Sequence, residues 1–123
     1  MSDSQPKTWV ITGADTGLGY HAARTALERG DRVFASVLAP HGQHALCADF
    51  PYTMRSAHLN LRKQSTIPDF VSKVLEAFGR IDVLVNNAGA GLLSIIEETP
   101  ADRYRDLFEV NFFGLVEMTK AVM

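Results

Sequence analysis

TGADTGLG, residues 12–19, lies between an apolar stretch rich in β-branched residues and a segment with helical periodicity. Its glycines are spaced as a tight strand-to-helix turn requires. We expect Gly13 to adopt backbone angles that other residues avoid. Gly17 leaves room for a bound group to approach the backbone, and Gly19 allows the helix to pack close to the strand. This stretch therefore predicts the first strand–turn–helix unit of an α/β fold.

A helix that begins at this turn also offers a place for an anion. The first amide N–H groups of a helix have no partner within it, and the helix dipole adds partial positive charge. The spacing G-x3-G-x-G differs from the usual dinucleotide pattern G-x-G-x-x-G, and a purely structural turn would also use glycine. We predict that the turn binds the pyrophosphate of a dinucleotide through Thr12, Gly13, Asp15, Thr16, Gly17, Leu18 and Gly19.

The rest of the chain continues the alternation of strand and helix. Thr66-Ile-Pro-Asp69 and Thr99-Pro-Ala-Asp102 have the spacing of a capping box, so we expect both threonine hydroxyls to cap helices. The expected strands are 8–12, 32–38, 56–61 and 81–85, and the expected helices are 18–29, 41–50, 66–78 and 100–123.

This order of elements favours a three-layer α/β fold, a doubly wound parallel sheet of the Rossmann type with strand order 3-2-1-4. The last helix is still in phase at Val122, and the apolar fourth strand would lie at the sheet edge. We therefore expect residues 1–123 to be the N-terminal, dinucleotide-binding part of a single domain, truncated after the fourth strand and the following helix.

Composition excludes several other classes. The net charge of −2 gives no basic surface for nucleic acid, and no apolar run approaches the roughly 18 residues of a membrane span. The single Cys47 cannot form an internal disulfide and is expected as a half-buried thiol on a helix. His41 and His44 lack further ligands, so we predict a solvated helix face and no metal site. These features favour a cytoplasmic protein with no nucleic-acid or membrane partner.

Two further motifs make the chain resemble a known family. Residues 12–19 resemble the TGxxxGxG motif of the short-chain dehydrogenase/reductase family, and Asn86-Asn-Ala-Gly89 resembles its NNAG motif. Asn111 matches the helix asparagine of the family's Asn-Ser-Tyr-Lys tetrad. The resemblance covers almost the whole chain and corresponds to the first half of a typical family member.

The resemblance implies an NAD(P)-dependent oxidoreductase that transfers hydride to or from a small-molecule carbonyl or alcohol substrate. It implies a catalytic role for Asn111, which would position a water in a proton relay, and a homo-oligomeric full-length parent. The chain contains no Tyr-x-x-x-Lys pair, so we expect it to be inactive alone. A non-catalytic dinucleotide-binding sensor, an inactive truncated gene product and a methyltransferase-like Rossmann domain remain as alternatives.

The resemblance also assigns a cofactor site beyond the turn. The NNAG loop would lie against the adenosine half of the cofactor, and Asn60 stands where the family often has an aspartate that touches adenine. An acidic residue at the end of the second strand would favour NAD, but Val37 stands there, so we expect NADP, with NAD left open. The predicted cofactor-binding residues outside the turn are Ser36, Val37, Leu38, Asn60, Leu61, Asn87, Ala88 and Gly89.

Overall fold

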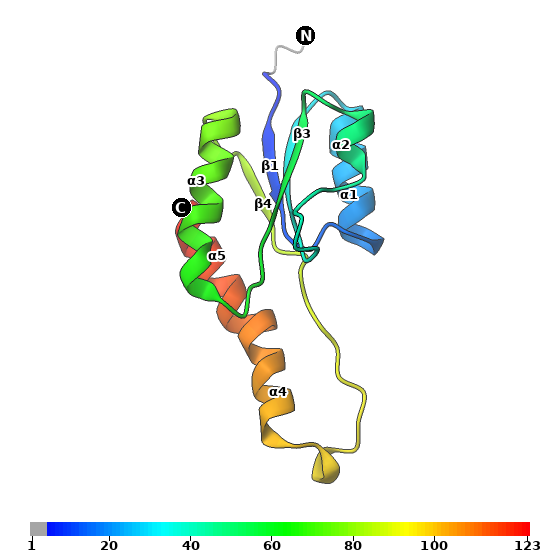
Figure 1. Ribbon diagram of the computed structural model, residues 1–123, viewed down its shortest axis with the longest axis vertical. Helices are drawn as coiled ribbons and strands as arrows, with labels where there is room; N and C mark the ends of the chain where they lie inside the picture. Colours follow the sequence, from blue (N-terminus) through cyan, green and yellow to red (C-terminus); the bar gives the residue numbers. More distant parts are fainter. Residues whose placement is uncertain (1–4) are drawn as a thin grey trace.

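The computed structural model describes residues 5–123 and contains a parallel sheet of four strands in the order β3-β2-β1-β4 (Figure 1). This is the strand order that the sequence predicts. The strands are β1 (Thr8–Ile11), β2 (Arg32–Val37), β3 (Met54–His58) and β4 (Val83–Val85). The helices are α1 (Gly17–Glu28), α2 (Leu46–Asp49), α3 (Ile67–Phe78), α4 (Ala101–Phe108) and α5 (Leu115–Val122).

The sheet separates two apolar cores, which makes the predicted three layers. Successive side chains of a strand point to opposite faces, so Val10 of β1 packs with α3 and α5 while Ile11 packs with α1 and α2. On β2, Phe34 joins the first of these cores and Val33 the second. Figure 1 shows α1 and α2 on one side of the strands and α3 and α5 on the other.

Several element bounds differ from the sequence-based prediction. The third strand runs over Met54–His58 and not 56–61, because Leu59 and Leu61 leave the sheet and pack into the core beside α3. The second helix begins only at Leu46, after Gly42 has taken a left-handed conformation with φ of 73°. The fourth strand is shorter than 81–85 and spans Val83–Val85.

Neither predicted capping box forms. The Thr66 hydroxyl donates to the carbonyl of Lys63 at 2.6 Å and caps no amide of α3. The Thr99 hydroxyl contacts Ser94 Oγ at 2.8 Å and the Ile95 carbonyl at 2.7 Å, and Pro100 stands at the helix cap. In both places a short 3₁₀ turn precedes the helix and brings a carbonyl nearer to the hydroxyl than the helix amides: η1 (Gln64–Thr66) and η2 (Ile96–Glu98).

The last predicted helix is interrupted. A π-helical segment, η3 (Glu109–Gly114), joins α4 to α5. Its wider turn allows Val110 and Met118 to enter the same core, where they are 6% and 0% exposed. In Figure 1, α4 projects away from the sheet while α5 returns along it beside α3. Within residues 5–123, no helix combines the length and the apolar character that a membrane crossing needs.

Candidate functional site

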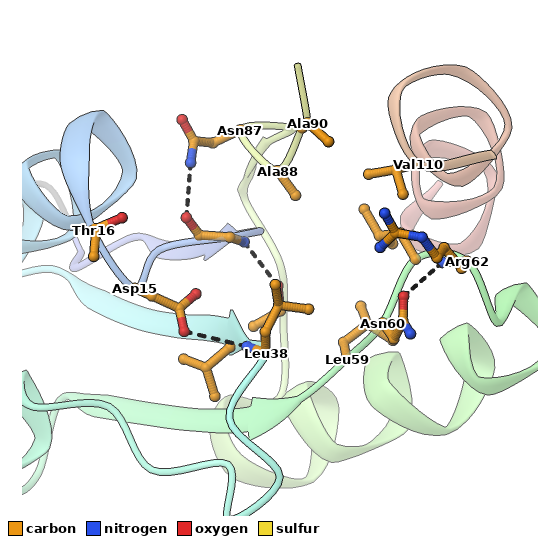
Figure 2. Close-up of a pocket in the computed structure, with 15 residues that line it drawn as sticks. Asp15, Thr16, Leu38, Leu59, Asn60, Arg62, Asn87, Ala88, Ala90 and Val110 are labelled. Carbon is orange, nitrogen blue, oxygen red and sulfur yellow. Dashed lines mark hydrogen bonds between the residues drawn. The ribbon is translucent and has the colours of Figure 1, made fainter. Parts of the chain in front are cut away.

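A pocket of about 510 Å³ lies at the carboxyl ends of the strands, between the turn before α1, the ends of β2 and β3, and the loop after β4 (Figure 2). Ligand sites in open parallel sheets occur at this edge. Predicted residues that line it are Gly13, Asp15, Thr16, Ser36, Val37, Leu38, Asn60, Leu61, Asn87, Ala88 and Gly89. Thr12, Gly17, Leu18 and Gly19 lie outside the lining, and the lining also contains Leu59, Arg62, Ala90 and Val110.

The glycine turn has the conformation that its sequence requires. Gly13 and Gly17 have φ of 62° and 63°, in the left-handed region that favours glycine. A Cβ on Gly13 would lie 2.8 Å from the Cα of Ala88, so the turn and the loop after β4 are in close contact. Apart from its chain neighbours and the backbone of α1, no heavy atom of the described residues lies within 4 Å of a Cβ placed on Gly17, so the space beside this residue is open.

The start of α1 is suited to an anion. Thr16 is its N-cap residue, and no side chain caps the first turn within the described part of the chain. Leu18 is 84% exposed and leaves the first turn open to solvent. Gly19 is buried, and a Cβ there would clash with Asn87 Nδ2 and the carbonyl of Gly13. The amide N–H groups at the start of α1 are therefore accessible, while the far side of this turn is tightly packed.

Ser36 holds the turn from the side of β2. Its Oγ accepts a hydrogen bond from the amide of Gly13 at 2.9 Å, and its carbonyl accepts one from Ala14 at 3.2 Å. Ser36 is 2% exposed, so both bonds are protected from water. This predicted cofactor-binding residue thus acts on the shape of the turn as well as lining the pocket.

Thr12 and Asn87 join the turn to the loop after β4. The Thr12 hydroxyl accepts hydrogen bonds from the amides of Asn87 at 3.1 Å and Ala88 at 3.0 Å. In return, Asn87 Nδ2 donates to the carbonyl of Gly13 at 2.9 Å and to that of Thr12 at 3.2 Å. The two motifs that the sequence singles out are therefore one hydrogen-bonded unit.

His44 is a third support for the turn, and the sequence analysis missed it. The prediction of a solvated helix face is wrong here, because His44 is 4% exposed and precedes α2. Its Nδ1 accepts from the amide of Leu46 at 2.9 Å, so Nε2 carries the hydrogen and donates to the carbonyl of Ala14 at 2.7 Å. A polar residue next to an apolar helix was the only signal that the sequence offered. Cys47, as predicted, is a half-buried free thiol on α2.

Two further polar side chains line the pocket. Asp15 Oδ2 accepts a hydrogen bond from the amide of Leu38 at 3.2 Å, and Asn60 Oδ1 accepts one from the amide of Arg62 at 3.0 Å (Figure 2). The Arg62 guanidinium is bonded to Asp106 of α4 through Nε at 2.6 Å and Nη2 at 2.8 Å. This bonding raises the pKa of Arg62 and lowers that of Asp106 from their ordinary values.

Asn111, on η3, holds the loop after β4 in place. Its Oδ1 accepts from the amide of Ala90 at 2.8 Å, and its Nδ2 donates to the Ala90 carbonyl at 2.7 Å. Both polar atoms of the side chain are therefore used to fix the loop after β4. Asn86, in the same loop, donates through Nδ2 to Thr119 of α5 at 3.1 Å.

The arrangement can hold an elongated anionic ligand with a flat apolar part. The accessible helix amides and the Asp15 carboxylate lie next to Thr16, and the side-chain amide of Asn60 lies on the other side of the pocket (Figure 2). The lining also contains apolar side chains that can cover a ring system. These are Val37, Leu38, Leu59, Leu61, Ala88 and Val110.

Solved structures share this fold. A short-chain dehydrogenase from Streptomyces avermitilis is 36% identical and superposes with a TM-score of 0.88, covering 99% of this chain and 44% of that protein. An alcohol dehydrogenase from Thermococcus sibiricus, complexed with 5-hydroxy-NADP, is 30% identical with a TM-score of 0.85, over 96% of this chain and 52% of that protein.

The sequence comparisons agree with the structural ones. Oxidoreductase BOA17 from Botryotinia fuckeliana is 34% identical over 118 residues, which are 95% of this chain and 43% of that protein. The chain therefore spans about half, or less, of the length of the proteins that it matches. A family model described as short chain dehydrogenase matches residues 7–123, and the chain accordingly belongs to the short-chain dehydrogenase family.

Proposed function

We propose that residues 1–123 form the N-terminal, dinucleotide-binding part of a single Rossmann domain, and that the pocket at the carboxyl ends of the strands binds NAD(H) or NADP(H). The whole protein would oxidise an alcohol or reduce a carbonyl of a small-molecule substrate. The observation that carries the proposal is the open space beside Gly17 at the start of α1, where no side chain of the described residues caps the helix and where Thr16 lines the pocket.

The pyrophosphate fits at the start of α1. Helix N-termini bind phosphate because their amides are unpaired and the helix dipole favours negative charge. The backbone carbonyls of the turn are turned away from this place, since Asn87 and His44 bind those of Gly13 and Ala14. Thr16, Gly17, Leu18 and Gly19 would therefore present amides, and not carbonyls, to the phosphates.

The adenosine half fits the far part of the pocket. Leu38, Leu61 and Ala88 offer apolar surface for the adenine ring. Asn60 Nδ2 is available to bind an adenine nitrogen, because the other polar atom of this side chain is bonded to Arg62. When bound, the cofactor would supply or accept the hydride of the reaction.

We propose that Asn111 has the catalytic role that the family resemblance implies. Its side chain would act by holding the loop after β4 in place. It fixes Ala90 by two hydrogen bonds, and Ala90 lines the pocket beside Gly89. The tyrosine and lysine that would carry proton transfer have no matching pair in this chain, so turnover would require residues of the longer protein.

Cofactor choice, location and assembly are finer points of the proposal. The apolar residues at the end of β2, taken alone, favour NADP, and the Thermococcus sibiricus relative was solved with 5-hydroxy-NADP. We propose a cytoplasmic location, which fits the composition. We propose homo-oligomerisation because apolar side chains of α4, η3 and α5 are exposed, namely Phe108, Phe112, Phe113 and Leu115.

A charge placed at the phosphate position tests the proposal. Thr16 is exposed, lines the pocket and has φ of −146°, so Thr16→Glu brings a carboxylate to the start of α1 without backbone strain. We expect it to weaken NADH and NADPH binding at least about tenfold by repulsion of the pyrophosphate. The measurement is fluorescence titration of the longest natural protein that contains this chain.

Ser72→Glu is the matched control, because it adds the same charge to an exposed position of α3 outside the pocket. This variant should bind both dinucleotides like the wild type. Equal affinity of the Thr16→Glu and Ser72→Glu variants would contradict the assigned phosphate position.

A further inference from the structure

Asp15 brings a negative charge to the end of β2, where the strand itself has none. The strand ends in Val37, and Leu38 follows, so neither side chain is charged. Asp15 belongs to the turn before α1, yet its Oδ2 accepts a hydrogen bond from the amide of Leu38 at 3.2 Å. Figure 2 shows the carboxylate beside Leu38 at the wall of the pocket.

This is the place where nicotinamide dinucleotide sites distinguish their ligands. In Rossmann folds, an acidic residue about 20 residues beyond the glycine turn binds the adenosine ribose hydroxyls, and a 2′-phosphate is accepted where a cation replaces it. Leu38 lies at about that distance beyond Gly19. Asp15 therefore reaches from the turn to the position that an acidic strand residue normally occupies.

The second carboxylate oxygen of Asp15 is available for a ligand. Oδ2 is bonded to Leu38, whereas Oδ1 has no hydrogen bond within residues 5–123. Because the amide of Leu38 fixes the carboxylate group, Oδ1 can accept from a ribose hydroxyl at little further entropic cost. A phosphate group at the same place would instead meet a like charge in a half-buried site.

Among the described residues that line the pocket, no cationic side chain is free to offset the charge of a 2′-phosphate. Arg62 is the one basic side chain among the lining residues, and two short hydrogen bonds tie its guanidinium to Asp106. His58, whose ring contacts the carbonyl of Leu38 at 3.1 Å, is directed to the backbone. A 2′-phosphate would have to break the pair between Arg62 and Asp106 to gain a counter-charge.

We propose that Asp15 is the cofactor-specificity residue of this protein and selects NAD over NADP. The inference rests on the proposed function, because it presupposes a dinucleotide in the pocket. It reverses the preference that the sequence suggests, since that preference assumes that only the end of β2 can supply a carboxylate.

The test removes the charge and keeps the shape. In Asp15→Asn the amide oxygen can still accept from Leu38, but the repulsion of a 2′-phosphate is lost. We expect the wild-type protein to bind NADH at least about tenfold more tightly than NADPH, and the variant to reduce this ratio at least about tenfold. The experiment is fluorescence titration with both reduced dinucleotides, together with competition by ADP and by 2′-phosphoadenosine 5′-diphosphate.

Asp49→Asn is the control, because it makes the same change of charge at an exposed position of α2 outside the pocket. It should leave the NADH to NADPH ratio unchanged. Wild-type preference for NADPH, or an unaltered ratio in a folded Asp15→Asn protein, overturns the role of Asp15 alone. If the wild type binds neither dinucleotide nor ADP, the proposed function fails, and the role of Asp15 with it.

The competition arm needs no variant. ADP and 2′-phosphoadenosine 5′-diphosphate differ only in the phosphate at the ribose 2′ position. If Asp15 acts as proposed, ADP competes with NADH more strongly than its 2′-phosphorylated form for the wild-type protein. The opposite order would overturn the proposal even if Asp15→Asn failed to fold.

Discussion

Thr12 connects the two motifs of the site through a single hydroxyl group. The side chain is 1% exposed, and its oxygen accepts from two consecutive amides of the loop after β4. The same hydroxyl lies 3.5 Å from the carbonyl of Val85, to which it donates. No other residue type that fills this space supplies an oxygen in this position, except serine.

Substitution of Thr12 therefore separates shape from hydrogen bonding. Thr12→Val keeps the volume but leaves the amide of Ala88 without its acceptor, whereas the amide of Asn87 keeps the carbonyl of Val85 at 3.0 Å. An unpaired buried amide costs about 1–3 kcal/mol, so we expect a loss of that size in the free energy of unfolding, measured by urea denaturation. Thr12→Ser, which retains the oxygen, should lose less than about 1 kcal/mol. Equal losses in the two variants would contradict this role.

For single residues, the backbone conformation of the glycines was easier to predict from the sequence than the hydrogen-bond partners of polar side chains. Gly13 could be recognised because a tight turn after a strand restricts which residue fits. His44 and Asp15 could not, because their partners are the carbonyl of Ala14 and the amide of Leu38, which only the folded chain brings near. Backbone groups of this kind are present at every position, so the sequence gives no signal of which one is used.

At the scale of the elements, hydrogen bonds of Asp82 join the start of β4 to β1, in addition to the hydrogen bonds between the two strands. Asp82, just before β4, donates its amide to the carbonyl of Thr8 at 2.9 Å and accepts the amide of Thr8 through Oδ2 at 2.8 Å. Arg80 donates to Oδ1 of the same carboxylate through Nη2 at 2.6 Å. The hydrogen bond from Thr8, followed by that from Arg80, lowers the pKa of Asp82 below its usual 3.8.

This shift predicts a pH dependence of stability. The Asp82 carboxylate stays ionised to a lower pH in the folded protein than in the unfolded protein. Its contribution to the free energy of unfolding is therefore complete above about pH 4 and is lost as the pH falls through the folded pKa. We expect Asp82→Asn to flatten the acid side of a plot of unfolding free energy against pH, from about pH 6 to about pH 2. Asp69→Asn, at an exposed position of α3, should follow the wild type. Parallel curves for the wild type and Asp82→Asn would refute the assignment.

Element order and element bounds were predictable to different degrees. The alternation of apolar patterns fixes four strands and their crossovers, because right-handed connections leave few topologies. The ends were less certain: Leu59 continues the apolar pattern of β3 but belongs to the core beyond the strand. The break at η3 is invisible in a pattern that allows one continuous helix, since it depends on Asn111 reaching Ala90 while Met118 stays buried.

At the scale of the whole molecule, the apolar surface is unevenly distributed. The strand β4 lies at one edge of the sheet, and its three residues are only half-buried. Beyond the end of the sheet, α4 projects away from the strands, and η3 and α5 lead back toward them (Figure 1). Phe112 and Phe113 of η3 are 52% and 48% exposed, and their rings pack edge to face with centroids 5.1 Å apart. Exposed aromatic pairs of this kind are typical of protein interfaces.

We predict that a second copy of the chain covers the exposed apolar patch, which consists of Phe108, Phe112, Phe113 and Leu115. Two-fold contacts bring the same patch of each copy together, so Phe112 of one copy would meet apolar groups of the other. A carboxylate there would be buried without a partner, so Phe112→Glu should weaken association at least about tenfold in sedimentation velocity over a concentration series. Leu93→Glu is the control, because Leu93 is fully exposed in the loop between β4 and α4, outside the patch. Wild-type protein that stays monomeric at about 100 μM would refute the interface, since stable dimers bury enough apolar area to form well below that concentration.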